Sequence, residues 1–211
     1  MRLAPDSTEH TDGLIHGDFP LWKGFEEMQA VQPPARLIFR SYGPEKSGKT
    51  HFGLTGPGPV AVLSFDIGLE GVVEKFVAQG KKVFVAEFEF DKSSKVLQAD
   101  AVALKARFLS AYETALKMAR TIIIDTETEL WEIYRHAEFP FGTDAPKNYV
   151  KLNADYRDMI QLAYDAGVNM QLVQKVKEKW GTIKKVNALG REVDSPYPTG
   201  EMEPTGFKEL G

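Results

Sequence analysis

Apolar runs and segments of helical periodicity alternate along the chain from residue 36 onward. Five runs rich in β-branched and aromatic residues predict strands at residues 36–42, 60–66, 81–90, 121–125 and 168–174. Between and after them, apolar residues recur at helical spacing, which predicts helices at residues 49–55, 68–80, 93–119, 128–139 and 150–167. The run TIIID at 121–125 is β-branched up to its final aspartate, as expected of a central strand that is covered on both faces.

Strands that alternate with helices predict a mainly parallel sheet joined by right-handed crossovers. We therefore expect an α/β domain, a three-layer sandwich, over residues 36–211. After residue 174 the pattern changes, and residues 181–195 predict a C-terminal β-hairpin that turns at NALGR. Residues 1–35 are polar and rich in turn residues, so we expect a partly ordered tail there. In such sheets ligands bind at the carboxyl ends of the strands, so the residues after each strand are the candidates for a site.

Composition narrows the class of protein. Of the 211 residues, 43% are hydrophobic, which is enough for a packed core. The chain has no cysteine, which excludes a disulfide framework, a thiolate zinc site and a cysteine nucleophile, and suits a reducing compartment. No apolar run reaches the length of a membrane span, so we expect a cytoplasmic protein with no membrane partner. Because the net charge is −4, contact with nucleic acid would have to come from a local basic patch.

The segment GPEKSGKT at 43–50 follows the first predicted strand and opens the first predicted helix. It matches the phosphate-binding pattern G-x-x-x-x-G-K-[ST] in full. Its glycines let backbone N–H groups turn toward a phosphate chain, and the positive end of the helix dipole points the same way. In this pattern the lysine reaches the β and γ oxygens and the final hydroxyl binds Mg²⁺. The sequence therefore predicts an ATP and Mg²⁺ site, with nucleotide-binding residues Gly43, Pro44, Glu45, Lys46, Ser47, Gly48, Lys49, Thr50 and His51.

Acidic residues at two strand ends could complete this site. A phosphate loop needs a second contact to the metal, and Asp125 at the end of TIIID is the candidate, although it could also cap the next helix. Hydrolysis requires a carboxylate that orients and deprotonates water. Asp66 and Glu70 are available in SFDIGLEG, and Asp66 is favoured because it lies at the strand end. Glu70 could instead lie on an exposed helix face, and Glu127 is either a further catalytic candidate or a first-turn acid that complements the helix dipole.

With these motifs the chain resembles the phage-encoded RecA-like ATP-binding proteins, single-domain P-loop ATPases of which some are single-strand annealing or recombinase factors. The resemblance covers residues 36–185 and rests on YGPEKSGKT, VLSFDIGLEGVVEKF, TIIIDTETELWE and NADYRDMIQLAYDAGVNMQLVQKVKEKW. It implies a RecA-like P-loop fold, Mg-ATP hydrolysis, homo-oligomeric rings or filaments, and contact with single-stranded DNA in phage recombination or replication. The family places a glutamate two residues after the strand-end aspartate, where this chain has Gly68, and the identity of the base stays open.

The segment LVQKVKEKWGTIKK at 172–185 is locally basic, with five lysines and one acidic residue. In RecA-like proteins a glutamine at this strand end senses the γ-phosphate, a role that falls on Gln174, and the following loop touches DNA. Trp180 among lysines would suit a platform on which bases stack. Alternatively, the lysines could reach a neighbour's ATP across a subunit interface or lie on a solvated hairpin. The residues concerned are Lys175, Lys177, Lys179 and Trp180.

Two other functions use the same phosphate loop. A small-molecule P-loop kinase is disfavoured because no arginine-rich lid is visible, and Arg135 and Arg157 are isolated. A nucleotide-binding interaction module of phage assembly, with little turnover, is compatible with the same motifs. Measuring ATP turnover with and without single-stranded DNA would separate these functions.

Overall fold

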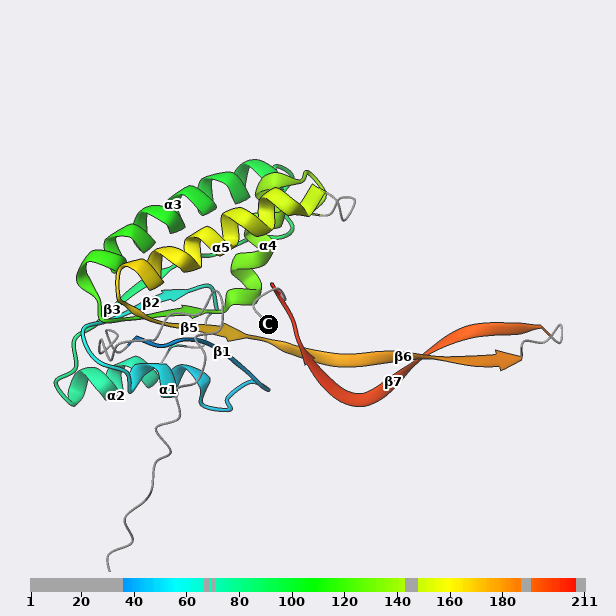
Figure 1. The fold of residues 1–211 in the computed structure, drawn as a ribbon, viewed down its shortest axis with the longest axis horizontal. Coiled ribbons are helices and arrows are strands. Elements are labelled where there is room, and N and C mark those ends of the chain that lie inside the picture. Colours follow the sequence, from blue (N-terminus) through cyan, green and yellow to red (C-terminus); the bar gives the residue numbers. More distant parts are fainter. Residues whose placement is uncertain (1–35, 67–68, 70, 143–147, 187–190, 208–211) are drawn as a thin grey trace, which may run out of the picture. The chain divides into compact units, whose positions relative to one another are not determined.

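The computed structural model describes residues 36–66, 69, 71–142, 148–186 and 191–207. The tail expected at residues 1–35 and the candidate base Glu70 lie outside the described residues. The described part is an α/β domain with a five-stranded parallel sheet and a separate two-stranded antiparallel hairpin (Figure 1). No helix within it is long and apolar enough to cross a membrane.

All five predicted strands are present in the sheet. They are β1 (Ile38–Tyr42), β2 (Val60–Ser64), β3 (Val83–Glu87), β4 (Thr121–Asp125) and β5 (Asn169–Gln174). Their order across the sheet is β1-β5-β4-β2-β3, and every neighbouring pair is parallel. Only β5 therefore lies between β4, which carries Asp125, and β1, which precedes the predicted phosphate-binding segment 43–50. We call this segment the phosphate loop.

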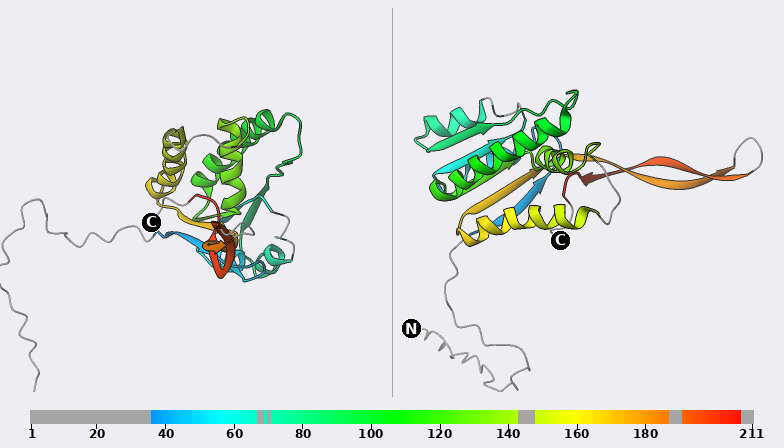
Figure 2. Two further views of the ribbon diagram at one scale, coloured as in Figure 1. Left: turned by 90° about the vertical axis from the view of Figure 1, so that its right-hand side faces the viewer. Right: turned by 90° about the horizontal axis from the view of Figure 1, so that it is seen from above.

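The predicted helices are also present, and they cover both faces of the sheet. They are α1 (Lys49–Leu54), α2 (Val72–Ala78), α3 (Leu97–Met118), α4 (Glu127–Glu138) and α5 (Tyr149–Asp165). Figures 1 and 2 show α1 and α2 on one face and α3, α4 and α5 on the other. The expected three-layer arrangement with a parallel central sheet is thus confirmed.

The central strand β4 supplies side chains to both hydrophobic cores. Ile122 and Ile124 belong to the larger core beneath α3, α4 and α5, whereas Ile123 belongs to the smaller core beneath α1 and α2. All three side chains are fully buried. Each contributes about 1.5–3 kcal/mol relative to an exposed position. This two-sided burial is the physical reason for the uninterrupted β-branched run, and it fixes Asp125 at the end of the strand.

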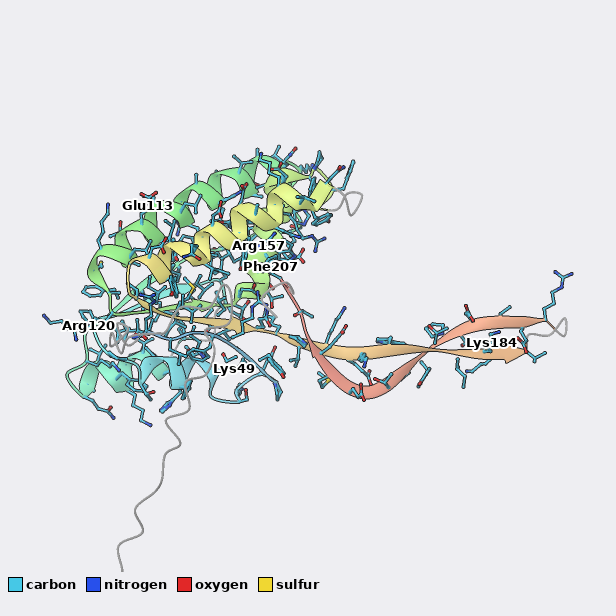
Figure 3. The ribbon with its side chains drawn as sticks, in the orientation of Figure 1. Lys49, Glu113, Arg120, Arg157, Lys184 and Phe207 are labelled. Carbon is cyan, nitrogen blue, oxygen red and sulfur yellow. The ribbon has the colours of Figure 1, made fainter. Side chains whose placement is uncertain are left out.

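The predicted hairpin is present and longer than the sequence pattern suggested. It pairs β6 (Val176–Val186) with β7 (Glu192–Pro204), and residues 187–190 between them lie outside the described residues. β7 contains Pro196 and Pro198, which a two-stranded ribbon tolerates because one edge of each strand needs no hydrogen-bond donor. The chain then returns to the domain, where Phe207 packs against Trp131 and Tyr156 (Figure 3).

Candidate functional site

The loop 43–50 joins β1 to α1 in a conformation that its glycines permit. Gly48 has φ 84°, in the left-handed region where side chains other than glycine are strained. A Cβ atom on Gly43 would lie 3.2 Å from the hydroxyl oxygen of Ser47, so the loop is also closely packed on itself. The spacing of the two glycines therefore serves the curled path of the backbone from the strand into the helix.

The ammonium group of Lys49 lies inside this curl. It donates hydrogen bonds to the carbonyl oxygens of Gly43 (3.0 Å) and Pro44 (2.7 Å) and to the hydroxyl of Ser47 (3.3 Å). The loop thus surrounds a positive charge with oxygen atoms of its own. A phosphate chain in the same place would offer charged oxygens to the same ammonium group, and such charge-assisted contacts are stronger.

The phosphate loop contacts the end of β4 directly. The hydroxyl of Thr50 donates a hydrogen bond to the carboxylate of Asp125, a residue 75 positions away in the sequence. Burial raises the pKa of Asp125 and the nearby charge of Asp66 adds to this, although the Thr50 hydrogen bond and two lysines oppose it. A cation placed here would therefore stabilise the ionised carboxylate. The hard oxygen donors of Thr50 and Asp125 suit Mg²⁺, which typically binds through one or two protein ligands plus substrate phosphates and water.

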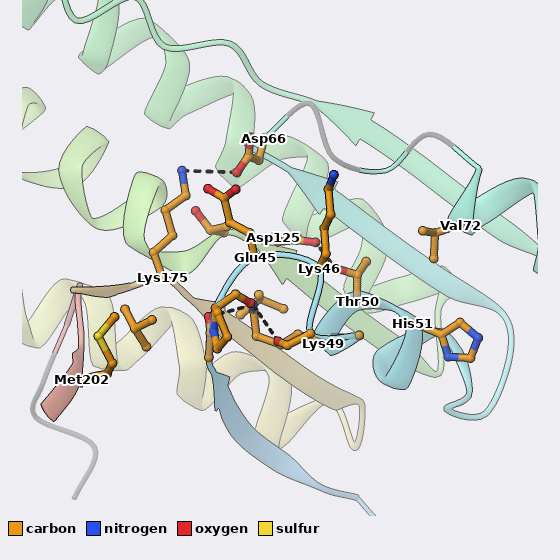
Figure 4. A pocket seen from close by; sticks show the side chains of 17 residues that line it. Glu45, Lys46, Lys49, Thr50, His51, Asp66, Val72, Asp125, Lys175 and Met202 are labelled. Atoms are coloured by element: carbon orange, nitrogen blue, oxygen red, sulfur yellow. Dashed lines mark hydrogen bonds and ion pairs between the residues drawn. The ribbon is translucent and has the colours of Figure 1, made fainter. Parts of the chain in front are cut away.

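A cavity of about 590 Å³ opens over the phosphate loop at the carboxyl ends of the strands (Figure 4). This volume falls within the range of small-molecule and cofactor sites. All nine residues predicted to bind nucleotide line the cavity, together with Asp66, Asp125 and Lys175. No group of three or more His, Cys, Asp or Glu side chains that could hold a metal ion by itself occurs among the described residues.

Asp66 belongs to a chain of charges beside the cavity. The ammonium group of Lys175 lies 3.2 Å from the carboxylate of Asp66 and 3.1 Å from that of Glu129, which also pairs with Lys92 at 2.8 Å. Burial alone would raise the pKa of Glu129, but the two lysines outweigh it and lower the pKa. For Lys175, burial would lower the pKa, and the two carboxylates outweigh it and raise the pKa. The ion pairs thus favour the charged forms of Glu129 and Lys175.

Glu127 and Gln174 face the protein interior. The side chain of Glu127 is fully buried and accepts hydrogen bonds from Gln174 (2.8 Å) and from the hydroxyl of Tyr156 (3.0 Å). The guanidinium of Arg40 lies 3.6 Å from the same carboxylate. Burial raises the pKa of Glu127, and these partners lower it in part. Neither Glu127 nor Gln174 is among the residues that line the cavity. Glu127, one of the three candidate bases, and Gln174, the candidate γ-phosphate sensor, therefore lie behind the cavity wall.

The hairpin is not a basic patch, contrary to the impression given by residues 172–185 in isolation. Strand β7 places acidic residues opposite the lysines of β6, with Lys177 at 3.3 Å from Glu203 and Lys179 at 2.8 Å from Glu201. The two strands together carry four lysines and five acidic residues, one net negative charge. Trp180 lies on the hairpin and its side chain is 61% exposed. The four residues proposed for DNA or subunit contact fall into two groups. Lys175 lines the cavity, whereas Lys177, Lys179 and Trp180 lie on the hairpin outside it.

Sequence reasoning missed two positions that support the site. Gln171 on β5 is buried beneath the phosphate loop and donates hydrogen bonds to Ser41 (2.8 Å) and to the carbonyl of Lys49 (2.9 Å). Thr128 on α4 accepts a hydrogen bond from the backbone N–H of Lys175 at 3.0 Å. An amide in the middle of the apolar strand NMQLVQ was the available signal for Gln171, whereas no local pattern pointed to Thr128.

No protein-family model matches the sequence, and no curated protein is detectably similar to it. The function of this chain therefore has to be inferred from its motifs and from the geometry of the cavity.

Proposed function

We propose that this chain is a RecA-like P-loop ATPase that binds Mg-ATP in the cavity over residues 43–50 and hydrolyses it. The observation that carries the proposal is the hydrogen bond between Thr50 and Asp125. It joins the two sequence motifs that phosphate and magnesium binding require, and it does so beside Lys49 on the floor of one cavity.

The strand order supports the RecA-like branch over the kinase alternative. In kinases and GTPases of the P-loop group, the strand with the magnesium-binding aspartate usually neighbours the strand before the phosphate loop. Here β5 lies between those two strands, as in the RecA-like and AAA-like branch. The intervening strand comes from later in the sequence than both, and it delivers Lys175 to the cavity.

Each residue of the proposed site would have its own role in hydrolysis. Backbone N–H groups of the loop and the Lys49 ammonium would bind the phosphates, while Thr50 and Asp125 would hold the magnesium ion. Bound Mg²⁺ would neutralise charge on the phosphate oxygens. Asp66 lines the same cavity and raises the pKa of Asp125, so we assign to Asp66 the role of a base that would orient a water molecule and accept its proton.

The role in phage recombination or replication and the assembly into homo-oligomers remain part of the proposal. They rest on the family resemblance, and for single-stranded DNA also on the exposed side chain of Trp180, because aromatic side chains offer stacking surfaces to unpaired bases. Because the acidic residues of the two hairpin strands offset the lysines, we expect the hairpin to bind single-stranded DNA mainly by stacking and not by charge.

Calorimetry with Mg-ATP tests the proposal. The wild-type chain should bind Mg-ATP, and Lys49→Ala should abolish binding while the melting temperature stays close to the wild-type value. Lys151→Ala, a change to an exposed lysine on α5 away from the cavity, serves as the matched control. Wild-type affinity in Lys49→Ala would refute the site.

Turnover measurements then separate an ATPase from a binding module. Asp125→Ala should lose magnesium-dependent hydrolysis, and single-stranded DNA should change the wild-type rate. Tight binding of Mg-ATP with no phosphate release, with or without DNA, would favour the interaction module of phage assembly instead.

A further inference from the structure

Lys175 differs from the other lysines of its segment. Lys177 and Lys179 pair with acidic residues of β7, outside the cavity. Lys175 lines the cavity of its own chain, and Figure 4 shows its side chain pointing toward Asp66 beyond the phosphate loop. A role in DNA binding or in a neighbour's site therefore does not fit Lys175 as well as a role in this cavity.

We propose that Lys175 is the cation that pairs with the terminal phosphate of a nucleotide bound in the same chain, and that Asp66 and Glu129 hold it in place until then. This inference rests on the proposed function. It assigns to one residue the distinction between a nucleoside triphosphate and a nucleoside diphosphate.

The backbone of Lys175 is fixed from two sides. Its N–H donates to the hydroxyl of Thr128 at 3.0 Å. Its carbonyl oxygen accepts from the N–H and from the hydroxyl of Thr205, both at 2.9 Å. The side chain thus starts from a fixed point at the cavity wall, and only its flexible four-carbon stem needs to move for the ammonium group to change partner.

The positions of Asp66 and Asp125 indicate which phosphate of a nucleotide Lys175 would contact. Its ammonium group lies 3.2 Å from Asp66, and its charge acts on Asp125. Asp125 and Thr50 would hold a magnesium ion, and that ion would neutralise charge on the terminal phosphates of the nucleotide. Lys175 would therefore contact the terminal phosphate from the side of the cavity that carries Asp66.

The surrounding charges allow Lys175 to leave its carboxylate partners at low cost. Glu129 keeps a second lysine, Lys92, at 2.8 Å when Lys175 turns away. When Lys175 turns away, Asp66 would also lose its ion pair with this lysine. A terminal phosphate would thus bind the ammonium group of Lys175 and at the same time remove this lysine from Asp66, the favoured candidate base.

Lys175→Met tests the inference, because it keeps an unbranched side chain only one atom shorter and removes the charge. Calorimetry should show Mg-ATP affinity reduced at least about tenfold, since a hydrogen bond to a charged group contributes about 1.5–3 kcal/mol. Mg-ADP affinity should stay within about twofold of wild type, since the missing cation does not reach the diphosphate. Lys92→Met is the matched control, because Lys92 shares Glu129 as a partner and does not line the cavity. It should leave the ratio of ATP to ADP affinity unchanged.

The outcomes distinguish this inference from the proposed function. A wild-type ratio of ATP to ADP affinity in Lys175→Met overturns the inference and leaves the ATP site standing. Failure of the wild-type chain to bind either nucleotide refutes the proposed function and this inference with it. Glu129→Gln provides a test that does not alter Lys175. It removes a competing carboxylate, so the ratio should rise or stay at the wild-type value, and a fall would count against the inference.

Discussion

The side-chain oxygen of Gln171 occupies the space where a Cβ atom on Gly53 would lie, because the two positions are 1.8 Å apart. Gly53 is on α1 directly behind the phosphate loop, and Gln171 is on the neighbouring strand β5. The amide nitrogen of the same glutamine donates hydrogen bonds to the hydroxyl of Ser41, just before the loop, and to the carbonyl oxygen of Lys49, near the end of the loop. A glycine in this helix is thus required by the glutamine that holds both ends of the loop.

Gly53→Ala should therefore destabilise the domain, although alanine in a helix is normally favoured over glycine by about 1 kcal/mol. We expect a loss of about 1–3 kcal/mol in the free energy of unfolding, as for other overpacked sites. Gln171→Ala removes the nearest clash and two hydrogen bonds, and leaves the Cδ1 atom of Ile123 at 2.8 Å from the new Cβ. The double variant should therefore be less destabilised than the sum of the single variants. Urea denaturation of the four proteins measures this coupling, and strict additivity would contradict the packing argument.

Asp66→Asn should lower kcat with little change in KM, because a general base acts in the chemical step. The expected loss is about 10²–10⁴-fold. Glu70→Gln is the comparison, since it changes the other carboxylate of the same motif. If Glu70→Gln carries the loss instead, that residue is the base. If neither rate falls about tenfold, the base lies elsewhere, and Glu127 would have to leave its buried position to serve.

Single-stranded DNA binding at the hairpin should depend on Trp180 more than on its lysines. Trp180→Ala should weaken binding by about 1–3 kcal/mol with little change in salt dependence. Alanine at both Lys177 and Lys179 should reduce affinity and the salt slope, which is about 0.7 per phosphate contacted. Fluorescence anisotropy at several salt concentrations measures both quantities.

Neutralising the acidic partners of these lysines provides a control for the same test. Glutamine at Glu201 and Glu203 frees the two lysines from their carboxylate partners and should tighten DNA binding. Equal affinity in all of these variants would exclude the hairpin from a DNA site. Loss of DNA-free ATP turnover in the lysine variant, with unchanged DNA affinity, would instead indicate a contact with a neighbouring subunit's nucleotide.

Glu129 should contribute to stability in a pH-dependent way. Its folded pKa lies below the ordinary value of 4.5, because two lysines outweigh the effect of burial. The contribution is therefore present above pH 4.5 and is lost as the pH falls through the lower folded pKa. Glu129→Gln should reduce the melting temperature near neutral pH and flatten its decline on the acid side of that window. Parallel melting curves for both proteins on acidification would show that the carboxylate contributes nothing.

The fold followed from local patterns because both faces of the sheet are covered. Ile122, Ile123 and Ile124 are all buried, so the strand reads as a continuous apolar run and its end at Asp125 is sharp. The phosphate loop was equally readable, since its backbone conformation depends on glycines at fixed spacing. Local sequence therefore predicted the strands, the helices and the floor of the cavity.

Contacts between distant elements could not be predicted in the same way. Glu127 was predicted to be either a further catalytic residue or a first-turn acid, whereas its buried carboxylate accepts a hydrogen bond from Tyr156 on the distant helix α5. The lysines of β6 looked like a basic patch because their partners, such as Glu201 and Glu203, come from a strand on the far side of a turn. In the sequence, Lys175 looked like one more lysine of the basic segment 172–185. Its backbone is hydrogen-bonded to Thr128 and to Thr205, and these contacts between distant elements, which we call the backbone clamp, could not be predicted from the sequence.

This clamp has a topological consequence. Val176 and Pro204 are paired residues at the foot of the hairpin, and Thr205 binds Lys175 directly before it. The chain thus leaves the domain and re-enters it at one point, as an insertion does, while Phe207 keeps its place in the core. Val176 and Met202 near the foot of the hairpin line the cavity, and the hairpin residues farther from the foot do not. The far part of the hairpin can therefore be shortened, extended or exchanged without loss of a cavity-lining residue, so a change of partner there requires the least change of architecture.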